Sequence, residues 1–288
     1  MTHTYRTISW ICTGAVIVYY VSISFVPFGW RGALPAAIVM GLIVIALMRP
    51  IQNRPRFIWK FVGSEQQISR VFPPILALLT VHIVLVGVLR AIGLSSTGLE
   101  IAIQLFVWII LPVFGALSGM LALPRRDREV RSKKTFTVYV AAIILAFMFG
   151  LMLTLPLAPR SELASPSRIV MEVGYFSALA TSEEIIFRMI MLTAIMQMSG
   201  SRWYALIISS TAFGLAHLPI AMLEPVVNAD PDQLVFYLKS FAPELVWKIG
   251  IGFILGALWI RTGSLVLVAL AHAIINVVPA IYSGSLPI

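Results

Sequence analysis

The stretch TSEEIIFRMI, residues 181–190, places two adjacent glutamates and an arginine inside an apolar run that extends from residue 169 to residue 198. That run is long enough to cross the hydrocarbon core of a membrane as a helix. An ionised side chain at that depth is costly unless it is paired or hydrated. The stretch therefore predicts a membrane-spanning helix whose three charged side chains have partners.

The composition of the whole chain is that of a membrane protein. Of the 288 residues, 59% are hydrophobic and 11% are charged, whereas soluble globular domains carry about 25% charged residues. Apolar runs separated by short polar connections predict an all-α, polytopic transmembrane helical bundle of about nine spans, with eight as the alternative. The runs fall near 8–28, 33–48, 72–93, 101–123, 136–158, 169–198, 203–222, 242–260 and 264–282.

The basic residues concentrate in the connections between these runs. One is the connection 49–70, and another is 124–134, which holds six lysines and arginines. Since short basic loops face the cytoplasm, we expect a cytoplasmic N-terminus, the turns around Arg202 and Arg261 on the same side, and the loop 223–240 on the other. The net charge of +9 then indicates membrane topology and contact with lipid rather than nucleic acid binding. We expect an integral protein of a prokaryotic inner membrane.

Several polar or aromatic groups lie near the predicted membrane boundaries. The stretch FIWKFVG, residues 57–63, is equally consistent with a short amphipathic helix at the interface and with an ordinary loop anchor. Glu244 and Lys248 are four residues apart at the start of the run 242–260, which predicts a surface ion pair. In the third run, His82 is expected to bond a neighbouring helix and Arg90 to extend toward the interface.

Helical spacing divides the three charges of residues 181–190 into two groups. Positions four apart share a helix face, so Glu184 and Arg188 are predicted to form an ion pair in the favourable order. Glu183 lies about 140° around the helix from Arg188. It is therefore a carboxylate without a partner on its own helix.

The same spacing recurs in two later runs, where it pairs Phe213 with His217 and His272 with Asn276. A carboxylate and a histidine from different helices can activate a water molecule by general base catalysis. A second imidazole and an amide can stabilise the oxyanion of a tetrahedral intermediate. These residue types are the ones needed to hydrolyse a peptide bond without a covalent intermediate.

The sequence resembles the CPBP family, the CAAX protease and bacteriocin-processing membrane proteins that include Rce1-type prenyl endopeptidases and Abi proteins. The resemblance covers roughly residues 170–280 and rests on three motifs in order: Glu183-Glu184-x-x-x-Arg188, Phe213-x-x-x-His217 and His272-x-x-x-Asn276. The apolar runs and basic connections predict N-terminal transmembrane helices with basic cytoplasmic loops over 1–165, and the resemblance implies a CAAX protease-like catalytic helical core over 166–288.

The resemblance also implies an activity, that of an intramembrane endopeptidase acting on a CAAX-type substrate or on a leader or membrane peptide. Its partners would then be membrane lipid and a peptide or lipidated protein. It assigns Glu183 as the catalytic carboxylate, His217 as its partner in holding water, and His272 with Asn276 as oxyanion stabilisers. The supporting residues are Glu184, Arg188 and Phe213.

Two questions stay open from the sequence. We favour no metal and no cofactor, because Asn276 is a poor zinc ligand, but Glu183, His217 and His272 could in principle bind zinc. Cys12, the only cysteine, excludes a cysteine-rich site. A non-catalytic immunity or assembly factor is the alternative function. A small proton-coupled transporter is less favoured, because the runs show no inverted repeat.

Overall fold

The computed structural model describes residues 58–92, 97–127, 139–144, 146–147, 150, 165–217 and 231–283. The predicted runs 8–28 and 33–48, together with Cys12, lie outside the described residues, as do most of the run 136–158 and the side chains of Arg90 and Glu244. The described chain is helical, as the composition predicts, apart from one short two-stranded sheet.

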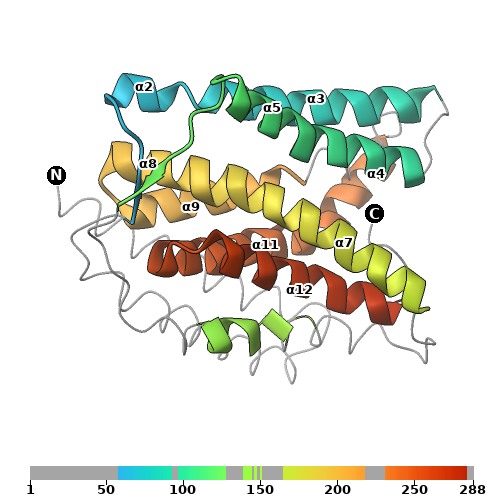
Figure 1. The fold of residues 1–288 in the computed structure, drawn as a ribbon. Coiled ribbons are helices and arrows are strands. Elements are labelled where there is room, and N and C mark those ends of the chain that lie inside the picture. The colour runs from blue at the N-terminus through green and yellow to red at the C-terminus, as the bar shows by residue number, and fades with distance from the viewer. Residues whose placement is uncertain are drawn as a thin grey trace.

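The elements follow one another as a series of helices. In chain order they are β1 (Trp59–Lys60), α2 (Glu65–Ser69), α3 (Phe72–Ala91), α4 (Thr97–Leu105), η1 (Phe106–Ile110), α5 (Leu111–Leu117), β2 (Arg125–Arg126), α7 (Pro166–Glu184), η2 (Ile185–Leu192), α8 (Thr193–Ser199), α9 (Arg202–Leu215), α11 (Pro231–Thr262) and α12 (Leu265–Ser283). The helix α7 lies between the pair α3 and α4 on one side and α12 on the other (Figure 1).

The predicted helix 169–198 is confirmed and carries an unexpected change of winding. The segments α7, η2 and α8 continue one another from Pro166 to Ser199, and the middle segment η2 is a π-helix. It begins directly after Glu184 and is buried on nearly all sides. Because π-helical segments are rare and often occur at functional sites, this position draws attention to the residues at the end of α7.

The helices α9 and α11 approach closely because glycines replace larger side chains where they cross. A Cβ atom added at Gly252 of α11 would lie 3.1 Å from the Cα of Ser210 and 3.2 Å from its carbonyl oxygen in α9. Gly214 of α9 meets Ile249 in the same way. Small residues at such crossings let two helices pack backbone against backbone.

We expect Gly252→Val to destabilise the protein by about 1–3 kcal/mol, because the added methyl groups meet α9 backbone atoms that cannot rotate away. Thermal unfolding of the purified protein in detergent measures the effect. Gly174→Val is the matched control, since a Cβ atom at this helical glycine meets nothing within 4 Å. Equal melting temperatures for the two variants would contradict the tight crossing.

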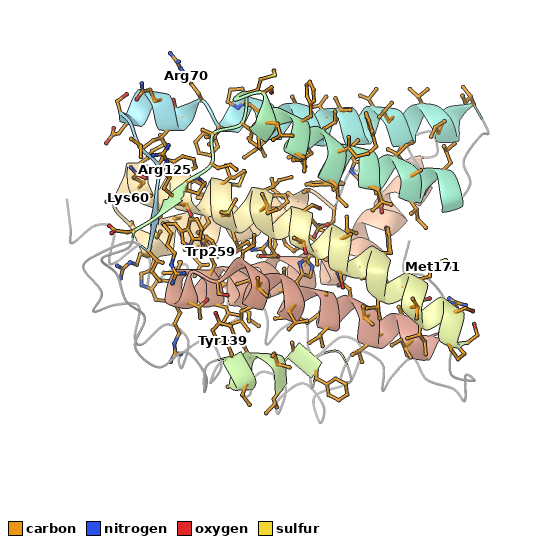
Figure 2. The ribbon with its side chains drawn as sticks, viewed as in Figure 1. Lys60, Arg70, Arg125, Tyr139, Met171 and Trp259 are labelled. Atoms are coloured by element: carbon orange, nitrogen blue, oxygen red, sulfur yellow. The ribbon has the colours of Figure 1, made fainter. Side chains whose placement is uncertain are left out.

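The predicted basic connections meet at one end of the bundle. The strand β1 pairs with β2 in an antiparallel register that aligns Trp59 with Arg126. Of the two alternatives for FIWKFVG, the interfacial helix is therefore wrong. The Trp59 indole donates to the carbonyl of Gly263 at 2.8 Å and stacks on Trp259. Lys60 and Arg125 lie together at this end of the bundle (Figure 2). The hydrogen bond of Trp59 therefore joins the two basic connections to the turn between α11 and α12.

Two helical stretches are long and apolar enough to cross a membrane, Gln67–Leu89 and Gly98–Leu117, and Leu265–Ile281 is a shorter apolar helix. This search covers the described residues alone, so the count of about nine spans stays a prediction. One boundary is wrong: α11 begins at Pro231, and the second part of the predicted loop 223–240 is therefore helical.

Candidate active site

The end of α7 and the middle of α12 form the centre of a buried polar cluster. The two helices run antiparallel, which places Glu184 opposite His272. Glu184 Oε1 accepts a hydrogen bond from His272 Nδ1 at 2.8 Å and lies 3.1 Å from Arg188 Nη1. The predicted ion pair is confirmed, and it includes a third member from another helix. The pair is fully enclosed, with Glu184 0% and Arg188 1% exposed.

Glu183 lies on the other side of the same imidazole. Its Oε2 is 3.7 Å from His272 Nε2, beyond hydrogen-bond distance, and the side chain is buried. The imidazole thus lies between two carboxylates, with a direct bond to Glu184 alone. Helical spacing separates Glu183 from the ion pair as predicted, but it gave no indication that His272 binds Glu184 more closely than Glu183.

The ring of Phe213 connects the motifs. The guanidinium carbon of Arg188 lies 4.2 Å from the centre of this ring, a cation–π contact that adds to its pairing with Glu184. Phe213 also packs edge-on against His217 at 4.9 Å and His272 at 5.6 Å between ring centres. The structure therefore brings both histidines to one aromatic side chain from two different helices.

The hydrogen bond of His217 fixes its tautomer. Its Nδ1 lies 2.8 Å from the carbonyl oxygen of Phe213. A carbonyl only accepts, so Nδ1 carries the proton, and Nε2 of the neutral ring keeps a lone pair. His217 therefore presents a hydrogen-bond acceptor.

Asn276 lies one turn after His272 on α12 and is half-buried. Its carboxamide makes no hydrogen bond to any residue within the described ranges. The structure thus places Asn276 one turn from His272 on the same helix, as predicted.

Neighbouring side chains donate hydrogen bonds to the backbone carbonyls of η2. Ser209 of α9 donates to the carbonyl of Phe187 at 2.8 Å, and Thr193 donates to the carbonyl of Arg188 at 3.3 Å. The Trp259 indole of α11 in turn donates to the Thr193 hydroxyl at 3.3 Å. Wider winding releases carbonyls from the regular ladder, and these side chains satisfy them. The segment that carries Arg188 is therefore fixed to both α9 and α11.

Two side chains near this cluster were not predicted to belong to it. Lys248 of α11 interacts electrostatically with both Glu183 and His217. Its predicted partner Glu244 lies outside the described side chains, so the ion pair at the membrane boundary stays a prediction. Tyr175 lies two turns before Glu183 on α7 and donates to Gln104 of α4. Its spacing of two helical turns from Glu183 is the sequence feature that could have indicated its position.

The third run carries a separate buried pair. His82 of α3 accepts a hydrogen bond at its Nδ1 from the Trp108 indole at 3.0 Å, which confirms the predicted bond to a neighbouring helix. Trp108 packs against Phe187 at 6.0 Å between ring centres. The pair of His82 and Trp108 therefore supports η2 from the side of η1, which is itself π-helical.

The arrangement does not match a zinc site. Among the described residues, no group of three histidine, cysteine, aspartate or glutamate side chains lies close enough together to hold a metal ion. Both ring nitrogens of His272 face carboxylates, and one of them is bonded to Glu184. Its imidazole would have to leave Glu184 or turn from Glu183 to bind a metal.

Comparison with known proteins finds a similarity in the C-terminal part of the chain. The family model for type II CAAX prenyl endopeptidase, Rce1-like, matches residues 164–278, and the predicted resemblance is confirmed over that range. The matched range contains all three motifs. Comparisons with curated proteins and with solved structures gave no match. The family match and the apolar helices together point to an integral membrane protein.

Proposed function

We propose that the protein is an intramembrane CAAX-type endopeptidase in which Glu183 activates the attacking water. One observation carries the proposal: Glu183 is a buried carboxylate beside His272, while the neighbouring Glu184 is already engaged by Arg188 and His272. The site thus separates a structural carboxylate from one that remains free to take a proton.

The hydrogen bonds suggest a role for each histidine. His217 Nε2, with its lone pair, accepts a hydrogen bond from the water and orients it, while Glu183 removes the proton that is lost on attack. His272 already donates from Nδ1 to Glu184. To donate from Nε2 to the oxyanion it must therefore carry a proton on both ring nitrogens. The Asn276 amide supplies the second donor.

The depth of the site favours a substrate that is held in the membrane. Glu184 is fifteen residues from Ser199, where α8 ends beside the basic loops, which corresponds to roughly 20 Å along the helix. A peptide that must reach such a depth gains from an attached lipid, since each buried methylene contributes about 0.8 kcal/mol. A prenylated CAAX peptide meets this requirement. A leader or membrane peptide is the second substrate class.

Reconstitution of the purified protein in liposomes tests the activity. The probe is a farnesylated peptide ending in a CAAX sequence, and the expected result is release of its C-terminal tripeptide, detected by mass spectrometry. A membrane peptide without the lipid is the comparison. Absence of cleavage of both would overturn the proposed function and favour a non-catalytic role.

We further propose that catalysis needs no metal. Chelators such as EDTA and 1,10-phenanthroline are expected to leave the cleavage rate within about twofold of its untreated value, because Glu183 and two histidines supply the proton transfers. Elemental analysis of the purified protein is the second measurement. One equivalent of zinc, lost together with activity on chelation and regained on its return, would contradict this proposal.

A further inference from the structure

The packing of α11 on α9 places Lys248 next to the candidate active site. The glycine contacts described above fix the register of the two antiparallel helices, with Gly252 against Ser210 and Gly214 against Ile249. Lys248 immediately precedes Ile249 and so lies at the level of Gly214 and of the nearby His217. The half-buried lysine therefore lies on the part of α11 that packs against α9.

Lys248 and Arg188 are both cations near the site, and they differ in their ion pairing. Arg188 is matched by Glu184 at 3.1 Å. Lys248 forms no ion pair or hydrogen bond with the side chains that the structure describes, a set that does not include Glu244, and it acts on Glu183 and His217 through space. An ammonium group inside a membrane requires an anion or water. Its placement suits an anionic group of a bound ligand near the reacting centre.

A CAAX-type substrate carries such a group. Cleavage after its cysteine releases three residues that end in a free carboxylate, and three extended residues span at most about 10 Å. The site must therefore accommodate a negative charge within that distance of the scissile carbonyl. We propose that Lys248 binds the C-terminal carboxylate of the peptide substrate and so selects free C-termini. This inference rests on the proposed function.

The first experiment compares two farnesylated CAAX peptides, one with a free C-terminal carboxylate and one with a C-terminal amide. For the unaltered protein we expect the KM of the amide to be about tenfold higher. Lys248→Met should raise the KM of the acid by about tenfold and leave the amide unchanged, with kcat altered less than threefold. Lys248→Arg should retain the preference, because it keeps the charge.

The second experiment separates binding from cleavage. Affinities for the same two peptides are measured in the Glu183→Gln background, with and without Lys248→Met, by microscale thermophoresis. An about tenfold preference for the acid that disappears with Lys248→Met supports the proposal, even if no cleavage is ever seen. Unaltered protein that binds but cleaves neither peptide would overturn the proposed function alone.

A different pattern would overturn the carboxylate site. If Lys248→Met lowers kcat equally for both peptides and leaves their relative KM unchanged, the lysine acts on Glu183 and not on the substrate. Equal affinity of the acid and the amide for the Glu183→Gln protein would have the same meaning.

Discussion

Glu183→Gln is expected to lower kcat for peptide cleavage by about a thousandfold or more, within the range that a general base contributes. The amide has nearly the same shape as the carboxylate, so the packing around His272 should be retained. It cannot accept the proton of the attacking water. The measurement is the cleavage rate of the reconstituted protein, with the melting temperature recorded on the same sample.

Glu172→Gln is the control for this variant. Glu172 is also a buried carboxylate on α7, and it pairs with Arg168 at 2.7 Å, far from the two histidines. We expect its replacement to leave kcat within about threefold, since the amide oxygen still accepts from the guanidinium. Equal activity of Glu183→Gln and the unaltered protein would eliminate Glu183 as the base.

The sequence was sufficient to predict the helical class and the pairing of Glu184 with Arg188. Both follow from local rules, because apolar composition demands helices in lipid and residues four apart share a face. It was not sufficient to find that His272 bonds Glu184, since this contact depends on the register of α7 against α12. Such a register is set by packing between helices and leaves no mark in the spacing of either one.

The predictions for the start of α11 and for the FIWKFVG stretch were wrong for a similar reason, because each used only the local sequence pattern. Hydropathy marks where a helix enters the apolar region, but α11 continues well outside its apolar stretch, to Pro231. The predicted loop 223–240 was consequently too long. The FIWKFVG stretch misled in a similar way, because its pairing with Arg125 and Arg126 depends on a loop more than sixty residues later. Local amphipathic pattern carries no information on such a partner.

Arg188→Met is expected to destabilise the fold by about 3–5 kcal/mol, the range observed when one member of a buried ion pair is removed. The variant leaves the Glu184 carboxylate enclosed, with its bond to His272 as the remaining contact. The methionine side chain has similar length, so lost packing against Phe213 contributes little. Thermal unfolding in detergent should show a large decrease in melting temperature, or a loss of folded protein.

The double variant Glu184→Gln/Arg188→Met separates charge from function. Removing both charges eliminates the unpaired carboxylate, so most of the lost stability should return. Activity should not return, because an amide accepts from His272 Nδ1 more weakly than a carboxylate does and holds the proposed oxyanion donor less firmly in place. Stability and cleavage are therefore expected to diverge in this protein. If the double variant regains both, the pair serves only to pack the helix. If Arg188→Met alone melts like the unaltered protein, the buried pair does not stabilise the fold.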